Sequence, residues 1–257
     1  TTPAATSSGS LVQAGRKLTL TLGAGGLDNR QGRLQGQDIQ VQTQGDIWAG
    51  QINAQNSLSL QADHIEAEQR IQATSVRVNA QRLHNTGRID GTQELQIEAQ
   101  RLDNSGTLQS ANTQLQGQTA GSATDLVLNN SGLVQGYVNL NIDAAQLLNT
   151  GTLSAGQAQI RGSDQLENRG VIFSTGNMTL QGQDIVNNQA RIYSMGDLNV
   201  EGSQTGQAAG SVFNYAGRIE AQGDIHINAD TLTNRAVLPS VNQRGFVEHI
   251  RDGGNII

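Results

Sequence analysis

The side chains that could perform acid–base chemistry or bind a cation are spread thinly along the sequence. The chain has 22 Asp and Glu residues, but no Asp-Asp or Asp-x-Asp sequence brings two carboxylates together. Asp46, Asp63 and Asp184 stand where solvated corners between strands are expected. General acid–base catalysis and Ca²⁺ binding both need clustered carboxylates. The sequence therefore argues against a carbohydrate-active enzyme and predicts no catalytic residue.

The four histidines do not form a metal-binding motif; they are His64, His84, His226 and His249. Only His64 and His84 lie about one repeat apart, and two ligands without a third do not define a metal site. The chain has no cysteine. We expect the histidines to be surface side chains, and we expect no metal or other cofactor.

The large aromatic side chains are the clearest candidates for contact with a partner. Most stand in the second half of the chain, at Tyr137, Phe173, Tyr193, Phe213 and Tyr215. Phe173 and Tyr193 each follow an isoleucine expected to point inward, so strand alternation turns them outward, where they can stack on neighbouring strands. Exposed aromatic side chains can bind sugars or proteins. They can equally pack against each other and support the strands.

Composition and charge exclude some classes of partner. The chain has 257 residues and a formal net charge of −6, and Lys17 is its only lysine. Without a basic stripe or cluster, nucleic acid is not expected as a partner. Neither a transmembrane run nor a signal peptide is recognisable. We expect the chain to be a segment of a longer protein that has its targeting signal elsewhere.

A repeated motif defines the elements that would position these side chains. The pattern Leu-x-Asn-x-Gly-x-Ile/Leu/Val returns about every nineteen residues and indicates a solenoid. Regular copies begin at Leu83, Leu102, Leu128, Leu147 and Leu166. Looser copies begin at Leu27, Ile185 and Val212.

Each repeat also contains two apolar residues separated by one residue, the spacing of one face of a strand. These pairs are Ile39/Val41, Leu58/Leu60, Val76/Val78, Leu95/Ile97, Leu140/Ile142, Met178/Leu180, Leu198/Val200 and Ile225/Ile227. We therefore expect three short strands in each coil: one around Leu-x-Asn, one around Gly-x-Ile and one around the apolar pair. No apolar face of helical period accompanies them.

The predicted fold is all-β: a right-handed parallel β-helix of about ten to eleven coils, which at the usual strand spacing forms a rod roughly 50 Å long. The β-helical shaft is expected over residues 11–235. Residues 1–10 are expected to be a linker or a frayed edge. Residues 236–257 lack the repeat and are expected to be a cap or the start of another region.

The predicted coils begin at Leu27, Ile47, Ile65, Leu83, Leu102, Leu128, Leu147, Leu166, Ile185, Val212 and Leu232. Ile47 and Ile65 lack the asparagine and are placed by the apolar pairs. Two intervals are longer than the others. Their surplus residues are small and polar, and we expect them to form loops at 118–123 and 203–210.

Coil stacking would align the motif asparagines into a ladder. An amide can donate to one neighbouring coil and accept from the other, which stabilises stacked parallel strands. A structural role is therefore expected rather than ligand binding. The predicted ladder consists of Asn29, Asn85, Asn104, Asn130, Asn149, Asn168, Asn187, Asn214 and Asn234.

The units 102–108 (Leu-Asp-Asn-Ser-Gly-Thr-Leu) and 166–172 (Leu-Glu-Asn-Arg-Gly-Val-Ile) resemble the repeats of filamentous haemagglutinin and related two-partner-secretion exoproteins. The phrases at 221–225 and 194–198 add to the resemblance, which covers roughly residues 11–234. Among these exoproteins are the toxin-delivery filaments of contact-dependent growth inhibition systems. The resemblance implies a right-handed β-helical shaft without catalytic residues.

The resemblance also implies a location and partners. Such a protein would be exported unfolded through an outer-membrane transporter and anchored at the bacterial surface. It would present an adhesive or receptor-binding region, or a distal toxin, to a target-cell receptor that is a protein or a glycan. Two alternatives stay open. The first is a passive spacer without binding of its own. The second is a polysaccharide-active enzyme, which the scattered carboxylates argue against. The strand edges at both ends could also pair end to end with another copy.

Overall fold

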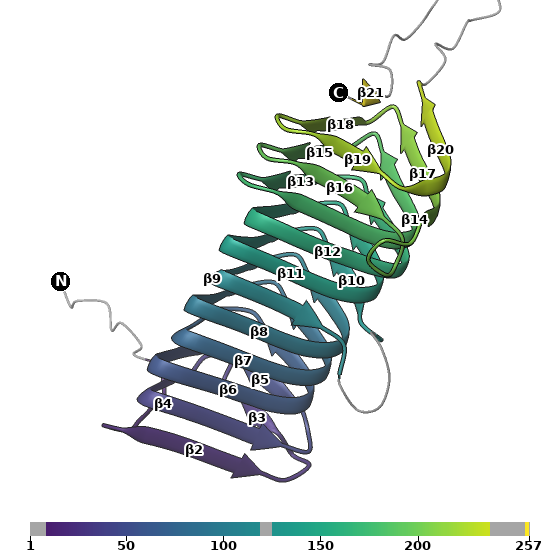
Figure 1. Cartoon of the computed structure of the whole chain (residues 1–257). Helices are drawn as coiled ribbons and strands as arrows, with labels where there is room; N and C mark the ends of the chain where they lie inside the picture. The colour runs from purple at the N-terminus through teal and green to yellow at the C-terminus, as the bar shows by residue number, and fades with distance from the viewer. Residues whose placement is uncertain (1–8, 119–124, 237–254, 257) are drawn as a thin grey trace, which may run out of the picture.

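The computed structural model describes residues 9–118, 125–236 and 255–256, and these residues form a stack of strands (Figure 1). The strands are β1 (Leu11–Gln13), β2 (Lys17–Leu22), β3 (Leu27–Asp28), β4 (Arg33–Thr43), β5 (Ile47–Ala49), β6 (Gln51–Ala67), β7 (Arg70–Asn85), β8 (Arg88–Asn104), β9 (Thr107–Gln116), β10 (Val127–Asn130), β11 (Leu133–Asn149), β12 (Thr152–Asn168), β13 (Val171–Ser174), β14 (Met178–Asn188), β15 (Arg191–Ser194), β16 (Leu198–Glu201), β17 (Ala209–Tyr215), β18 (Arg218–Ala221), β19 (Ile225–Ile227), β20 (Ala229–Arg235) and β21 (Asn255–Ile256). Within the described ranges, no helix is long and apolar enough to cross a membrane.

The strands stack in parallel, as the repeat predicts. Every pairing among the described strands is parallel. Several strands, such as β8, bend at a corner and continue onto the next face of the coil. The all-β solenoid is therefore confirmed, whereas its right hand stays a prediction.

Each coil has three faces, which we name by the motif that forms them. The Leu-Asn face contains the row of motif starts, and each predicted start pairs with the next, from Leu27 to Leu232. The Gly-Ile face contains the apolar residue after the motif glycine, as in Ile89 and Leu108. The pair face contains the two apolar residues, as in Leu95 and Ile97.

The number of coils is slightly larger than predicted. The row on the Leu-Asn face has eleven positions, whereas the row on the Gly-Ile face continues from Val12 to Ile256. Strands β1 and β21 therefore extend the stack at its two ends, to about twelve turns in total. In the predicted tail, residues 237–254 and 257 lie outside the described residues, while Ile256 pairs with Ile219.

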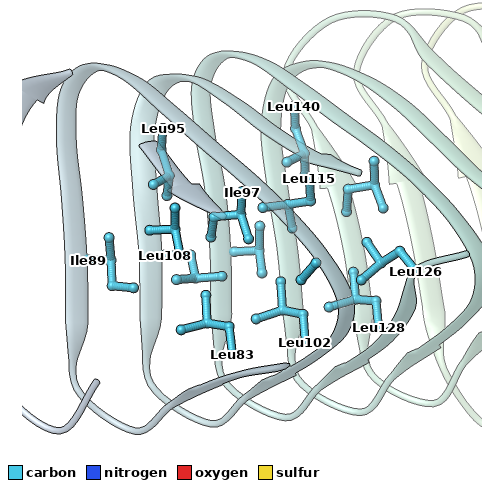
Figure 2. Packing of buried hydrophobic residues seen from close by; sticks show 14 of the residues in the cluster. Leu83, Ile89, Leu95, Ile97, Leu102, Leu108, Leu115, Leu126, Leu128 and Leu140 are labelled. Carbon is cyan, nitrogen blue, oxygen red and sulfur yellow. The ribbon is translucent and has the colours of Figure 1, made fainter. Parts of the chain in front are cut away.

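The core is a continuous column of apolar side chains enclosed by the three faces. Figure 2 shows Leu83, Ile89, Leu95 and Ile97 pointing into the interior from one coil, with counterparts such as Leu102 and Leu128 following to the right in the next coils. All four side chains are fully buried. A fully buried side chain of this kind stabilises the fold by about 1.5–3 kcal/mol. Because each coil adds several such side chains, burial along the repeat holds the stack together.

The motif glycines allow adjacent coils to approach closely at the corner between the Leu-Asn and Gly-Ile faces. A Cβ atom at Gly106 would lie 2.0 Å from the carbonyl oxygen of Gly87, and one at Gly132 would lie 2.1 Å from that of Gly106. No side chain fits at such distances without a backbone shift. The glycine of the motif is thus explained by contact between coils, since none of these glycines has a positive φ.

All three looser motif copies, which begin at Leu27, Ile185 and Val212, contain one extra corner residue. Their apolar residues are seven positions apart in sequence rather than six, as from Val212 to Ile219. Gln189 (φ 51°) and Ala216 (φ 47°), at equivalent places in these corners, adopt the left-handed conformation. In the copies that begin at Ile185 and Val212, the extra residue is therefore accommodated by local backbone strain, while strand register on both sides is kept.

Candidate functional site

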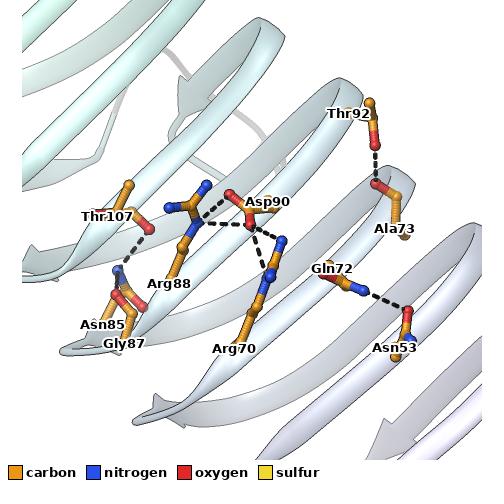
Figure 3. A network of polar contacts seen from close by, with 10 residues as sticks. All are labelled: Asn53, Arg70, Gln72, Ala73, Asn85, Gly87, Arg88, Asp90, Thr92 and Thr107. Atoms are coloured by element: carbon orange, nitrogen blue, oxygen red, sulfur yellow. Dashed lines mark hydrogen bonds and ion pairs between the residues drawn. The ribbon is translucent and has the colours of Figure 1, made fainter.

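Eight of the nine motif asparagines form a continuous row that is joined by seven side-chain hydrogen bonds. Starting at Asn85, each Nδ2 donates to the Oδ1 of the next asparagine at 2.7–2.9 Å, as far as Asn234. The same Nδ2 atoms also point toward backbone carbonyls, for example those of Gly87 and Thr107 around Asn85 (Figure 3). Asn85 to Asn214 are buried along this row. Their amides therefore have partners within the protein, as expected of structural groups.

Asn29 does not join this ladder, contrary to the prediction. It lies in the same row, but Ala49 and Ala67 occupy the two coils between it and Asn85. Its Nδ2 instead donates to the carbonyl oxygen of Gln51 at 3.4 Å. Alanine offers no hydrogen-bond partner, so the ladder begins at Asn85, whose buried Oδ1 accepts no hydrogen bond within the described structure.

Two carboxylates on the outer side of the Gly-Ile face are each held by two arginines. Asp90 accepts from Arg70 of the preceding coil and from Arg88 of its own coil, as Figure 3 shows. Glu220 is held in the same way by two arginines at 2.9 and 2.8 Å, Arg191 and Arg218. Both carboxylates are largely buried beneath the arginines. This arrangement ties neighbouring coils together and leaves neither carboxylate free to act as a base.

The structure brings His64 and His84 to the same carboxylate. His64 Nε2 lies 3.2 Å from Glu66 Oε1, and His84 Nδ1 lies 2.8 Å from Glu66 Oε2. The side chains are partly exposed on the outer side of the Leu-Asn face. Within the part of the chain that the structure describes, no three His, Cys, Asp or Glu side chains are placed to hold a metal ion. His226 lies on the pair face, far along the stack, and His249 is outside the described residues.

Two aspartates on the outer surface have lowered pKa values. The hydrogen bond from the Arg30 side chain lowers the pKa of Asp28 to about 2. For Asp103, burial acts to raise the pKa, but hydrogen bonds from Arg101 and Asn129 outweigh it, and the net pKa is lowered. Both groups are thus held as carboxylate anions by cationic or amide neighbours. A general acid would need the opposite shift.

The five aromatic side chains are divided among three places. Phe173 and Tyr193 stack across adjacent coils of the Gly-Ile face, with centroids 5.8 Å apart. Phe213 and Tyr215 stack along the outer side of β17, with centroids 5.9 Å apart. Tyr137 stands alone at a corner of β11 and is 55% exposed. A single aromatic ladder is therefore not formed, and the two stacked pairs are packed against themselves.

Of the two predicted loops, one lies almost wholly outside the described residues, since 119–124 are not described. The other is shorter than predicted, because residues 209–210 already belong to β17. Its remaining part folds back on itself: Gly202 N donates to the Gln207 carbonyl at 2.7 Å, and Gly206 N donates to the Glu201 carboxylate at 2.8 Å. Nothing in the repeat pattern singles out Glu201, because its burial depends on the fold of the loop.

The parallel stack, the asparagine ladder and the glycine corners together define a structural β-solenoid. A model of the haemagglutinin repeat matches residues 3–62, 134–208 and 200–245. These segments cover more than half of the chain, which therefore belongs to the haemagglutinin-repeat family. The family and the fold indicate an adhesin-like shaft of a secreted or cell-surface protein. Searches of curated proteins and of solved structures found no match.

Proposed function

We propose that the chain is the shaft of a bacterial exoprotein exported by two-partner secretion and anchored at the cell surface through its outer-membrane transporter. The shaft would present an adhesive or receptor-binding region, or a distal toxin, to target cells. The supporting observation is the uninterrupted register of the Leu-Asn row from Leu27 to Leu232. A stack of this kind gives stiffness and length without a catalytic centre.

Coil deletion in the full-length protein tests this role. Removing residues 83–101 takes out one whole coil and joins Arg82 to Leu102, which pairs with the same row. A presenting shaft should stay folded and exported, and contact with target cells should persist over a slightly shorter reach. Removing only residues 83–92 breaks the register and serves as the control that should fail to fold. Loss of target-cell contact after the whole-coil deletion, with export intact, would count against a purely mechanical role.

A second function, direct recognition of the target surface by this segment, is favoured by the exposure of Tyr137 and its neighbour Val138, at 55% and 54%. Saturable binding of the purified, labelled segment to intact bacterial or host cells would support it. If the folded segment binds neither cell type, the passive-spacer function is the one that remains. Concentration-dependent sedimentation of the same sample would reveal end-to-end association.

A further inference from the structure

We infer that a polar groove on the outer side of the pair face is a binding site for a neutral glycan. This inference names a ligand class for the direct recognition proposed above, and rests on that proposal. The groove consists of two adjoining hollows of about 440 Å³ each, which share Asn141, Gln159, Gln181 and Thr205. This size lies in the range of small-molecule sites in proteins.

The loop after β16 forms one wall of the groove and is fixed by buried polar groups. Gln181 Nε2 donates to Glu201 Oε1 at 2.9 Å and to Thr205 Oγ1 at 3.3 Å. The other carboxylate oxygen of Glu201 accepts from Gly206 N. Gln181 and Glu201 are 4% and 6% exposed. The wall is therefore held in place before any ligand arrives.

The floor of the groove presents side-chain amides whose hydrogen-bonding capacity is unused. Asn141 and Gln159 occupy adjacent coils of one outward row and are exposed. They make no side-chain hydrogen bond within the described structure. Beside them, Gln114 donates to Gln116 at 2.7 Å, and Arg161 Nη1 donates to Asp143 at 3.0 Å, whereas the buried Nε of Arg161 has no partner within the described structure. Each amide can donate and accept at once, which suits the hydroxyl groups of a sugar.

The lining disfavours a peptide ligand. The apolar residues of the groove, Leu115, Ile142 and Ala158, are buried side chains of the core and form no apolar pocket. The backbone of the floor is paired with coils on both sides, so no free strand edge is available for an added strand. Arg161 and Asp143 neutralise each other, and the Glu201 carboxylate is buried and hydrogen-bonded. Among the described residues that line the groove, Arg161 is the one cation, and its charge is offset by Asp143, so a neutral glycan fits best.

The test is binding of the purified 257-residue segment to an array of neutral, sialylated and sulfated oligosaccharides, followed by titration calorimetry with the best neutral ligand. We expect retention of neutral glycans, and an association constant at least tenfold lower for Asn141→Ala and for Gln159→Ala. Gln40→Ala is the matched control, since Gln40 belongs to the same outward row but lies four or more coils from the groove. It should bind like the unmodified segment.

Three results would overturn the inference: no glycan binding, preference for acidic glycans, or neutral-glycan binding that survives both groove substitutions. The segment is also tested on a peptide array. Retention on the peptide array but not on the glycan array would likewise contradict the inference. Cell binding that persists in the Asn141→Ala and Gln159→Ala variants would exclude the groove while leaving direct recognition intact. If neither cells nor glycans are bound, recognition by this segment fails as a whole, and the shaft role is unaffected.

Discussion

At the scale of single residues, the asparagine ladder shows how one side chain per coil can fix the stack. Each amide of the ladder satisfies its neighbour in the next coil, so loss of one member leaves buried groups without partners. An unsatisfied buried polar group costs about 1–3 kcal/mol. The natural defect of this kind is at the start of the ladder, where the Oδ1 of Asn85 faces the coil of Ala67.

Extending the ladder by one coil should stabilise the protein. Ala67→Asn would place a donor beside Asn85 Oδ1, in a corner with the same spacing between apolar residues as the asparagine corners. We expect the free energy of unfolding to rise by about 1 kcal/mol, measured by chemical denaturation. Ala80→Asn, a buried position outside the ladder, is the control and should be destabilising. Equal loss of stability in both variants would contradict the proposed role of the row.

The left-handed corner residue offers a second stability prediction. Ala216 has a φ of 47°, a conformation that costs a residue with a side chain roughly 1–2 kcal/mol and glycine little. Ala216→Gly should therefore raise the midpoint of thermal unfolding. In Ala155→Gly, which alters a strand residue without positive φ, the midpoint should fall. A decrease in both variants would show that the corner is not strained.

The carboxylate pKa values predict behaviour in acid. Because the pKa of Asp28 in the folded state is about 2, against an ordinary value of 3.8, its interaction with Arg30 contributes stability above pH 3.8. That contribution is lost as the pH falls toward 2. Carboxyl-carbon NMR titration should give a midpoint near 2 for Asp28, and Arg30→Ala should move it toward 3.8. An unchanged midpoint in the variant would assign the shift to another cause.

At the scale of the strand, alternation decides which residues support the core. In β13, Ile172 is fully buried while its neighbour Val171 is 38% exposed. Ile172→Asp buries an unpaired carboxylate and should lower the free energy of unfolding by several kcal/mol, or prevent folding of the adjacent coils. Val171→Asp adds the same charge on the outer side and should cost far less. Thermal unfolding of both variants by circular dichroism compares them directly.

At the scale of the whole molecule, stability should vary along the stack because each coil contacts only its neighbours. Strands β7 and β8 lie within the stack, pair with other strands on both sides and contain fully buried rows. Strand β20 is mostly exposed. We expect amide hydrogen exchange to be slowest in β7 and β8 and fastest in β20. Uniform protection throughout would mean that the stack unfolds as one unit.

The sequence by itself determined the structure of the coil, because in a parallel stack the same positions must be apolar and inward-facing in every turn. The apolar rows, the motif starts and the parallel stacking follow from the period, and the structure confirms them. Where a coil departs from the motif, the period does not predict which residue points inward. Thr113 occupies a core position of the pair face, buried and hydrogen-bonded to Ser110 and to the Gln135 carbonyl. Only the neighbouring coils reveal that such a residue can be inside.

The outer surface was decided by the tertiary structure. The grouping of the aromatics and the groove beside Glu201 both depend on which residues of different coils become neighbours. Inward positions are constrained by the same packing in each coil, so the period predicts which residues occupy them. Outward positions face solvent and vary freely, and their contacts arise only when the loops and corners have set the distance between coils.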